Sequence, residues 1–393
     1  MKILMSAITC FDAEPGGLSR YFMEIARGLS AGGNEVTVLV LGEAPGAKAP
    51  AGTLRVRRVP GASLPARVIN FYRALVSELR GNKYDVYNPH FALYVFGPML
   101  AGRLKKCPVV FNFQGPWSGE AGVELSGGSG GLSLPGRIVC AMKKFVEEFV
   151  YRRCDRLIVL SREFKQILVE EYGVAPARVV VLAGGCDVNR FVPGNKGEAR
   201  RALGLPRSPK IVFTVRRLVN RTGIDLLIKA MPILKRHNHN CLLVVGGDGP
   251  QKPGLENLAR ELGLAGAVIF TGYIPEEDLP LFYRAADVTV VPSLAFEGFG
   301  LVTVEALACG VPVVATPVGG NVEILCRLEP RLLSRSVSAE SLAEKINGVL
   351  AGEDWVPDPH RCRNFAVQNY SWSKIARDVL AVFQAEANKR QSG

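Results

Sequence analysis

Two consecutive α/β domains, each with a parallel sheet, are predicted by this sequence of 393 residues. Short apolar runs alternate with amphipathic helical patterns along the chain, and this alternation is typical of parallel α/β architecture. It restarts near residue 208, after a stretch (189–201) with the Pro, Gly and charge content of a linker. The length is also comfortable for two domains. We therefore expect one Rossmann-like domain over 1–190 and another over 200–371.

The individual elements follow from periodicity. Continuous apolar runs predict buried strands, and apolar residues at helical spacing predict helices with one buried face. The expected strands are 36–41, 109–113, 179–183, 210–215, 242–245, 288–291 and 311–315. The expected helices are 17–31, 223–235, 254–262, 278–286, 302–309 and, after a break at Asn369 and Tyr370, 372–388. The Gly-, Pro- and Ala-rich segments 42–53 and 118–136 are expected to be loops.

The net charge of +12 is concentrated in the first half of the chain. Residues 1–195 hold 24 basic and 16 acidic side chains, a net +8, and the remainder holds 24 and 20, a net +4. A solvated basic surface, attraction to anionic lipid headgroups and attraction to a phosphorylated substrate all remain open. No helix-turn-helix, zinc-finger or RNA-binding aromatic signature accompanies the charge, so we do not expect nucleic acid as a partner.

Cysteine spacing and hydropathy indicate the compartment. The nine cysteines show no Cys-x-x-Cys spacing, which argues against a disulfide framework and a structural zinc site. The N-terminal apolar run is too short for a signal peptide, and no apolar stretch approaches the ~18 residues that span a bilayer. We expect a cytoplasmic protein, and the basic first domain admits peripheral contact with the inner membrane surface.

The segment FEGFGLVTVEALACGVPVVAT, from Phe296, carries the strongest chemical signal. Gly298 and Gly300 lie between a strand and a helix, where a tight turn and unpaired helix N-terminal amides form a cradle for a diphosphate. Glu297 precedes this loop and Glu305 lies in the first turns of the helix. Each carboxylate can accept two hydrogen bonds from a vicinal diol. Taken alone, the pattern also admits a structural reading, in which two glutamates lie beside a turn.

This segment resembles the signature of glycosyltransferase family four, in which two glutamates are separated by seven residues, and the similarity runs along nearly the whole chain. The resemblance implies the GT-B fold: two Rossmann-like domains facing across a cleft, with a C-terminal helix (372–393) crossing back to the first. It also implies that Glu297 contacts the donor sugar and Glu305 the nucleotide ribose. The backbone between them, at Gly298, Phe299, Gly300, Leu301 and Val302, then meets the diphosphate.

A second segment, FTVRRLVNRTGIDLLIKA, places Arg216, Arg217 and Arg221 after a strand, where guanidinium groups can neutralise a diphosphate. The family shows an arginine and a lysine here, both on the donor phosphates. Arg217 matches the arginine, whereas Thr222 stands at the lysine position with Arg221 before it. The resemblance further assigns Gly247 to donor binding, and Tyr273 and Ile274 to the nucleotide base.

The first domain offers fewer matches. Gly16 and Gly17 resemble the family's N-terminal glycine-rich loop and are candidates for donor binding, although a plain turn is equally consistent with them. Gln114 stands where related enzymes carry a histidine that touches the transferred sugar. Because Gln cannot titrate, only positioning is expected of it. His90 and Trp117 are further candidates on the acceptor side, and a structural role for His90 stays open.

The resemblance implies transfer of a hexose-type sugar from a UDP- or GDP-sugar to an acceptor hydroxyl with retention of configuration. Glu297, Arg217 and Gln114 are the candidate catalytic residues. No Asp-x-Asp motif occurs, so we expect metal independence, and no cofactor besides the co-substrate. The acceptor is open: a small molecule, a glycan or a lipid-linked sugar. A sugar-nucleotide epimerase and a non-catalytic nucleotide-binding protein are the alternatives, whereas a nicotinamide oxidoreductase lacks its GxGxxG.

Overall fold

The computed structural model describes residues 1–8, 16–42, 53–125, 133–236 and 240–392. The chain divides into two compact units, which we call unit 1 and unit 2. Unit 1 comprises Met1–Gly122, Ser133–Gly184 and Trp372–Gly393, and unit 2 comprises Val123–Leu132 and Gly185–Ser371. The chain therefore passes from unit 1 to unit 2 at Gly184 and Gly185, shortly before the predicted linker.

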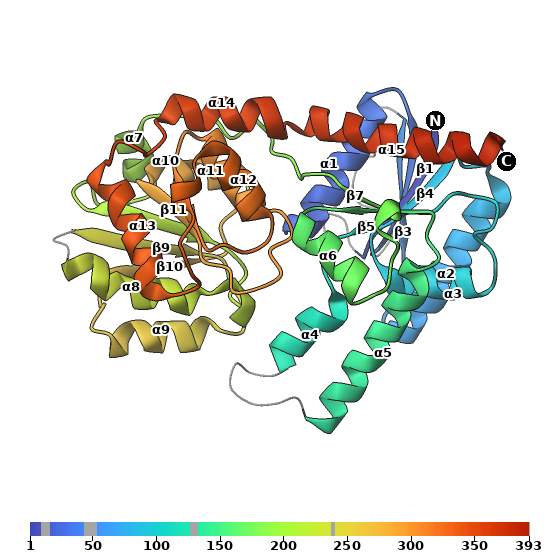
Figure 1. Cartoon of the computed structure of the whole chain (residues 1–393), viewed down its shortest axis with the longest axis horizontal. Helices are drawn as coiled ribbons and strands as arrows, with labels where there is room; N and C mark the ends of the chain where they lie inside the picture. Colours follow the sequence, from blue (N-terminus) through green and yellow to red (C-terminus); the bar gives the residue numbers. More distant parts are fainter. Residues whose placement is uncertain (9–15, 43–52, 126–132, 237–239, 393) are drawn as a thin grey trace. The chain divides into compact units, whose positions relative to one another are not determined.

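Unit 1 contains a parallel sheet in the order β3-β2-β1-β4, continued by β5-β6-β7 through a parallel bridge between Tyr87 and Val109. Apart from the edge strand β3, which is partly exposed, the strands are largely buried because helices lie on both faces (Figure 1). Their bounds are β1 Lys2–Ser6, β2 Glu35–Leu41, β3 Leu54–Val59, β4 Val86–Pro89, β5 Val110–Phe113, β6 Arg156–Val159 and β7 Val179–Val181.

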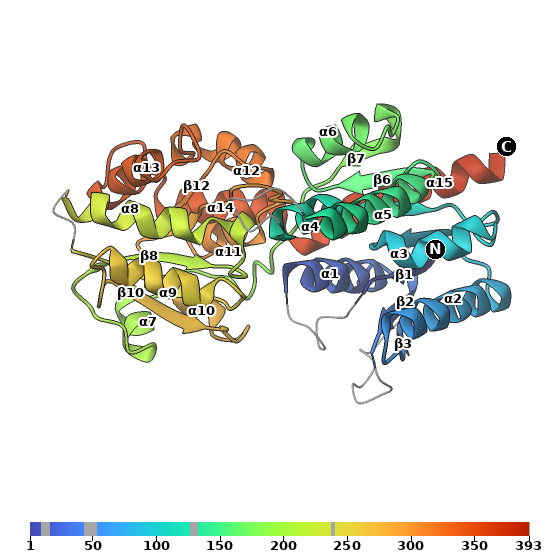
Figure 2. The ribbon, with the colours of Figure 1, turned by 90° about the horizontal axis from the view of Figure 1, so that it is seen from below.

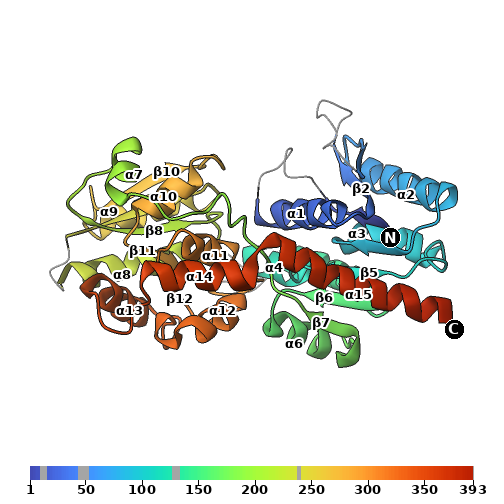
Figure 3. The ribbon, with the colours of Figure 1, turned by 90° about the horizontal axis from the view of Figure 1, so that it is seen from above.

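The helices of unit 1 include the last one of the chain. They are α1 Gly17–Ala31, α2 Leu64–Gly81, α3 Ala92–Leu100, α4 Trp117–Leu125, α5 Leu134–Tyr151, α6 Arg162–Glu170 and α15 Trp372–Ser392, with α4 crossing the unit boundary. Helix α15 lies beside α1 (Figures 2 and 3) and is fixed by an ion pair of 2.6 Å between Arg156 and Glu386. The C-terminal helix thus returns to the first unit, as the GT-B resemblance implies.

Unit 2 contains one five-stranded parallel sheet in the order β10-β9-β8-β11-β12. Its strands are β8 Lys210–Val215, β9 Cys241–Gly246, β10 Val268–Gly272, β11 Val288–Val291 and β12 Val313–Ala315. Its helices are α7 Lys196–Ala202, α8 Ile224–Arg236, α9 Lys252–Glu261, α10 Leu279–Ala285, α11 Leu301–Ala308, α12 Gly320–Leu328, α13 Ala339–Ala351 and α14 Pro359–Tyr370. β8 and β11 are neighbours, which brings their carboxyl ends to the same edge of the sheet.

Two local predictions were wrong. The linker 189–201 contains α7, because Asn195 caps the helix by accepting a hydrogen bond from the amide of Glu198. The loop 118–136 is helical over 118–125 and 134–136; its central part, 126–132, lies outside the described residues. Of the predicted loop 42–53, residues 43–52 also lie outside them. The predicted break before the last helix is confirmed within a residue or two, since α14 ends at Tyr370 and α15 begins at Trp372.

The remaining predicted strands and helices are confirmed to within a few residues at their ends. Within the described residues, eight cysteines carry free thiols; Cys10 lies outside that part of the chain. The helices described here include none that combines the length and the apolar character needed to cross a bilayer.

Candidate functional site

Glu297 lies at the carboxyl edge of the unit 2 sheet, and its carboxylate is held by two side chains. Arg216, which follows β8, forms an ion pair with Oε2, and Ser293, which follows β11, donates to the same oxygen at 2.6 Å. Arg216 Nη1 also donates to Ser293 Oγ at 2.9 Å, closing a triangle. Burial alone raises the pKa of Glu297, but the charge of Arg216 and these hydrogen bonds hold it below the usual range. The carboxylate is therefore ionised at neutral pH.

The backbone around Glu297 is strained and tightly enclosed. Phe296 has a φ of 52°, a left-handed conformation that side chains rarely adopt. Gly319, with φ 58°, lies so close that a Cβ there would be 1.8 Å from the carbonyl oxygen of Glu297. The amide of Gly320 donates to that same oxygen at 3.0 Å. The Gly319–Gly320 turn thus fixes where the Glu297 side chain begins.

The start of α11 has the properties expected of an anion cradle. Gly300 is its N-cap residue with φ 95°, and no described side chain caps the helix. Its first amides are therefore left without the usual side-chain acceptor. Nearby, the hydroxyl of Thr303 donates to Asn321 Oδ1 at 2.6 Å, while Asn321 Nδ2 is buried with no hydrogen-bond partner among the described residues. This first turn also contains Leu301 and Val302, both half-buried.

Glu305 is buried on the inner side of α11. The hydroxyl of Tyr283, from α10, donates to Glu305 Oε2 at 2.7 Å. Phe191 and Phe213 pack against the ring of Tyr283, edge to face. Tyr283 thereby fixes the orientation of the carboxylate that the resemblance assigns to the nucleotide ribose.

The other basic side chains of this edge differ from one another. Within the described chain, the side chain of Arg217 is exposed and has no hydrogen-bond or ion-pair partner. Arg221 Nη1 contacts the carbonyl of Phe296 at 3.4 Å, next to Glu297. Thr222, at the position of the family's lysine, is buried and donates to the carbonyls of Val219 (2.7 Å) and Arg217 (3.0 Å). Thr222 is therefore a turn-forming residue, and the positive charges beside it are those of Arg217 and Arg221.

The remaining donor-site candidates form the rim of the same sheet edge. Gly247 has φ 110°, and a Cβ there would lie 1.9 Å from the carbonyl of Arg216. Asp248 accepts a hydrogen bond from the amide of Gly249 at 2.8 Å, which is turn chemistry. Tyr273 is exposed, whereas Ile274 is buried. The exposed ring of Tyr273 and the backbone beside it are the parts free to meet a planar base.

In unit 1, Gln114 and His90 contact each other at the carboxyl ends of β5 and β4. The amide nitrogen of Gln114 donates to His90 Nδ1 at 2.9 Å, so Nδ1 carries no proton. His90 Nε2 then donates to Asn88 Oδ1, also at 2.9 Å. Burial lowers the pKa of His90 to about 3, so the ring is neutral in the physiological range. Gln114 is thereby oriented by an uncharged histidine.

The network continues into the core of unit 1. Asn88 Nδ2 donates to the carbonyl of Val110 at 2.6 Å, and Asn112 Nδ2 donates to the hydroxyl of Tyr21 at 3.0 Å. Burial raises the pKa of Tyr21 to about 12, with its hydrogen bond to Asn112 opposing the shift. Every side chain in this hydrogen-bonded network is neutral, so the network fixes positions rather than moves protons.

The other unit 1 candidates have ordinary structural surroundings. Gly17 begins α1, and Gly16 is its exposed N-cap residue in an extended conformation that any residue adopts, so φ does not require glycine there. The ring of Trp117 contacts Phe91, and Lys143 Nζ lies 4.6 Å above it. These three residues are placed in unit 1, and no described contact joins them to Gln114.

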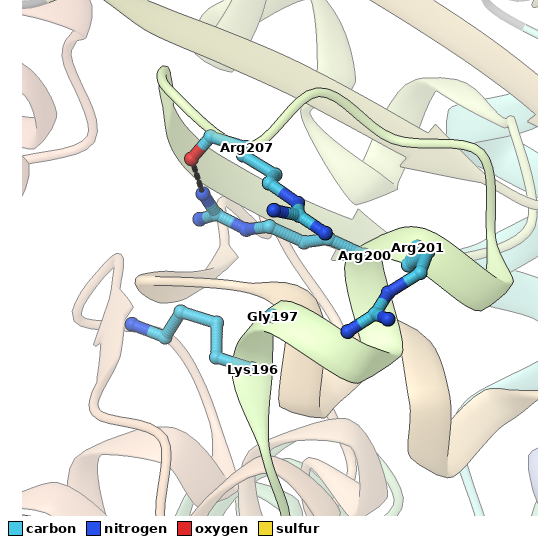
Figure 4. Close-up of a pocket in the computed structure, with 5 residues that line it drawn as sticks. All are labelled: Lys196, Gly197, Arg200, Arg201 and Arg207. Atoms are coloured by element: carbon cyan, nitrogen blue, oxygen red, sulfur yellow. Dashed lines mark hydrogen bonds between the residues drawn. The ribbon is translucent and has the colours of Figure 1, made fainter.

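A surface cavity of about 310 Å³ elsewhere in unit 2 is lined by none of the predicted residues. Figure 4 shows its lining at α7 and the loop before β8: Lys196, Gly197, Arg200, Arg201 and Arg207. Asp287 pairs with Arg200 at 2.6 Å and with Lys196 at 2.8 Å, and Arg200 also donates to the carbonyl of Arg207 at 2.7 Å. These contacts anchor α7 to the sheet and account for the charges that meet there.

The sequence alone did not single out Ser293, Tyr283, Asn321 or the Gly319–Gly320 turn, and it predicted that Arg216 neutralises a diphosphate rather than that it pairs with Glu297. A usable signal existed: Arg216 and Ser293 each follow a strand of the same parallel sheet, and such positions converge. Gly319–Gly320 likewise precedes a helix. Finding the pairs required the strand order, which the sequence analysis did not predict.

Comparisons with known proteins agree with this geometry. Residues 195–369 match the family described as Glycosyl transferases group 1, and residues 15–190 match Glycosyltransferase Family 4. A D-inositol 3-phosphate glycosyltransferase of Acidothermus cellulolyticus is 34% identical over 334 residues, covering 79% of this chain and 72% of that protein. A glycosyltransferase of Methanocaldococcus jannaschii is 28% identical over 399 residues, covering 98% of each.

Solved structures match over nearly the whole chain. Sucrose-phosphate synthase from Thermosynechococcus elongatus superposes with a TM-score of 0.79 at 23% identity, covering 98% of each chain. Anabaena HepE in complex with UDP-glucose gives 0.75 at 21% identity, covering 98% of this chain and all of that one. At such identities these structures show the fold alone. From the family matches, the Acidothermus relative at 34% identity and the shared fold, we conclude that this chain belongs to glycosyltransferase family 4 and has the GT-B fold.

Proposed function

We propose that this glycosyltransferase moves a hexose-type sugar from a UDP- or GDP-sugar to an acceptor hydroxyl, with retention and without a metal ion. The observation that carries the proposal is the ionised, immobilised carboxylate of Glu297 beside the uncapped N-terminus of α11. Unit 2 thereby offers a carboxylate that can accept hydrogen bonds from sugar hydroxyl groups, next to backbone amides that can bind phosphate. These two sites match the sugar and the diphosphate of a nucleotide sugar.

Glu297 binds the donor sugar in this proposal. An ionised carboxylate accepts hydrogen bonds from two adjacent hydroxyl groups, and charged acceptors form the stronger bonds. Arg216 and Ser293 hold Oε2, so Oε1 is the oxygen directed to the sugar. Since both partners are attached to neighbouring strand ends, the carboxylate is positioned before the donor arrives.

The diphosphate binds to the first turn of α11, whose N-cap is Gly300. Arg217 and Arg221 supply the positive charge, and the amides of the first helical turn supply donors. These groups stabilise the charge that develops on the departing diphosphate. Glu305, oriented by Tyr283, accepts from the ribose hydroxyl groups.

The chemical step is a front-face displacement. The acceptor oxygen forms a bond to the anomeric carbon while the bond from that carbon to the diphosphate oxygen breaks. The bonding electrons leave with the nucleotide diphosphate, and the acceptor proton passes to the departing phosphate oxygen on the same face. No protein base is needed, which is consistent with the neutral, low-pKa His90 and the non-titrating Gln114 in unit 1.

Gln114 is proposed to position a substrate hydroxyl. Its amide nitrogen is occupied by His90 Nδ1, which leaves Oε1 as a hydrogen-bond acceptor at the end of β5. A hydroxyl group of the acceptor or of the transferred sugar fits this requirement. The histidine of related enzymes is therefore replaced by an amide that a histidine on the neighbouring strand end orients.

Two measurements test the proposal. Nucleoside diphosphates and nucleotide sugars are screened for an increase in the melting temperature of the protein, because a ligand that binds only the folded state stabilises it. UDP is the first choice, since the solved HepE structures hold UDP or UDP-glucose. The stabilising sugar nucleotide is then incubated with candidate acceptors, and the anomeric configuration of the product is read by NMR. An inverted product contradicts the retaining mechanism.

Metal independence has its own test. Because arginines and helix amides neutralise the diphosphate, we expect turnover to persist in excess EDTA. Activity that EDTA abolishes and Mn²⁺ restores contradicts this part of the proposal.

A further inference from the structure

A second surface cavity, of about 300 Å³, lies in unit 1 between the carboxyl end of β3 and helix α2. β3 is the edge strand of its sheet, and α2 lies against it (Figure 2). The residues that line the cavity include Arg57, Arg58 and Pro60 from the strand end and Asn70, Arg73 and Ser77 from the helix. Three guanidinium groups thus line one cavity, whose volume is at the lower end of the range for small-molecule sites.

The charge of this part of the chain is almost entirely of one sign. Residues 54–81, which form β3, α2 and the turn between them, contain six arginines, no lysine and one acidic residue, Glu78. Their net charge of +5 is most of the +8 carried by the first half of the chain. A guanidinium group is a planar fork of donors that matches the oxygens of a phosphate. The composition therefore favours a phosphate-bearing ligand.

A buried carboxylate fixes the position of Arg57. Glu78 is 6% exposed, and it accepts hydrogen bonds from the hydroxyl of Tyr84 (2.6 Å), the amide of Asn82 (2.8 Å) and Arg57 Nη1 (3.0 Å). Arg57 is thus held against the wall of the cavity before any ligand binds. Its charge is balanced by that of Glu78.

The other two arginines keep their charges uncompensated. Arg58 is half-buried and Arg73 is exposed, and among the described residues neither side chain has a hydrogen-bond or ion-pair partner. Two positive charges therefore remain in the cavity. They match one phosphate monoester, which carries a charge of about −1.5 to −2 at pH 7.

The neutral part of the lining suits hydroxyl groups. Asn70 Nδ2 donates to the carbonyl of Pro60 at 2.9 Å, which orients the amide and leaves Oδ1 as an acceptor. Asn70, Arg73 and Ser77 are spaced by three and four residues, so they share one face of α2. A ligand whose phosphate lies at Arg73 therefore has an amide oxygen and a hydroxyl group on either side of it.

We propose that this cavity binds a phosphate monoester of a small hydroxylated molecule, such as a sugar phosphate. Arg58 and Arg73 bind the phosphate beside the immobilised Arg57. In the strand order, β3 is four strand spacings from β5, which is about 19 Å at about 4.8 Å each. A small ester in the cavity therefore does not reach Gln114 at the end of β5. The site is separate from the reaction proposed above, and the inference does not depend on that reaction.

The test is calorimetric titration of the full chain with glucose 6-phosphate, and with glucose and inorganic sulfate for comparison. The wild-type protein should bind glucose 6-phosphate at least severalfold more tightly than either of the other two. Arg58→Gln/Arg73→Gln removes the two uncompensated charges and should weaken this binding about tenfold or more. The matched control Arg103→Gln/Arg137→Gln removes the same charge at exposed positions elsewhere in unit 1 and should bind as wild type.

Melting temperatures separate binding from folding. The substituted side chains lie at the surface, so both double variants should melt within about 2 °C of wild type. If Arg58→Gln/Arg73→Gln unfolds, Arg73→Gln alone repeats the titration and should show a smaller loss of affinity.

Excess UDP should leave the binding of glucose 6-phosphate unchanged. Displacement by UDP, together with wild-type affinity in Arg58→Gln/Arg73→Gln, would place the ester at the start of α11 and overturn the proposal. The proposal is also overturned if glucose 6-phosphate binds no more tightly than sulfate. The same holds if these arginines bind vesicles that contain phosphatidic acid but bind no soluble ester.

Discussion

The two units place polar side chains at the same structural position and give them opposite electrostatic characters. In unit 2, the ends of neighbouring strands β8 and β11 bring together an arginine and a glutamate, and the carboxylate stays charged in a buried place. In unit 1, the ends of β4 and β5 bring together His90 and Gln114, and both stay neutral. The same kind of strand end thus carries a charged carboxylate in unit 2 and a neutral hydrogen-bond network in unit 1. The difference is that an opposite charge lies beside the carboxylate in unit 2.

The largest effect is expected from removing the positive charge beside Glu297. In Arg216→Met, Glu297 keeps its burial but loses the cation, so its pKa should rise. Turnover should fall about 100-fold at neutral pH, and the acid limb of the kcat profile should move to higher pH. Arg217→Met is the matched control: its side chain is exposed and does not pair with Glu297, so it should raise the donor KM without moving the acid limb. Identical acid limbs in the two variants would contradict the proposed role of Arg216.

Tyr283→Phe tests whether the buried side chain of Glu305 in unit 2 depends on the hydroxyl donor that α10 supplies. The change removes the 2.7 Å hydrogen bond to Glu305. Hydrogen bonds to charged groups contribute about 2 kcal/mol, so the free energy of unfolding should fall by about that amount, with weaker nucleoside diphosphate binding. Denaturant unfolding and calorimetry check both effects. Unchanged stability and affinity would show that Tyr283 does not fix Glu305.

The neutral network of unit 1 has its own pH signature. The pKa of His90 is about 3 in the folded protein and near 6.5 in an unfolded chain, so the unfolded state binds more protons between these values. Stability is therefore fully present above about pH 6.5 and is lost as the pH falls, by about 1.4 kcal/mol per unit within the window. His90→Gln should lack this component. Equal slopes for both proteins between pH 6 and 5 would show that His90 titrates normally.

Substitutions of Gln114 are expected to have the smallest effect on activity. Gln114→Ala removes one neutral hydrogen-bond acceptor, worth about 1 kcal/mol, or about fivefold in kcat/KM. Gln114→His restores the side chain of related enzymes at this position and should retain more activity than alanine. If both variants match wild type in turnover and donor affinity, Gln114 has no positioning role.

The sequence predicts features that lie within one continuous segment better than contacts between separate strands and helices. The Glu297–Glu305 segment was predictable, because its glycines, helix start and glutamates are contiguous. The partners Arg216, Ser293 and Tyr283 were not assigned, because those contacts join different strands and helices and depend on the strand order. The same limit hid the contact between His90 and Gln114, which the sequence named only as separate candidates.

The helices of the low-complexity regions were missed for a different reason. The composition of 118–136 is dominated by Gly and Ser, which predicts a loop, yet α5 begins at Leu134 behind the capping Ser133. The buried Glu147, thirteen residues further on, holds the helix in place through contacts from α4 and from Tyr172. Local composition could not show that anchor.

The most direct test of the account is to separate donor chemistry from nucleotide binding at Glu297. Glu297→Gln keeps the size of the side chain but removes the charge that Arg216 and Ser293 stabilise. Kinetics with the identified sugar nucleotide should show kcat lowered by about 100-fold or more, while calorimetry shows nucleoside diphosphate affinity within a few-fold of wild type. Turnover equal to wild type would contradict the assignment of Glu297 to the donor sugar, and so would loss of nucleotide binding in a folded variant.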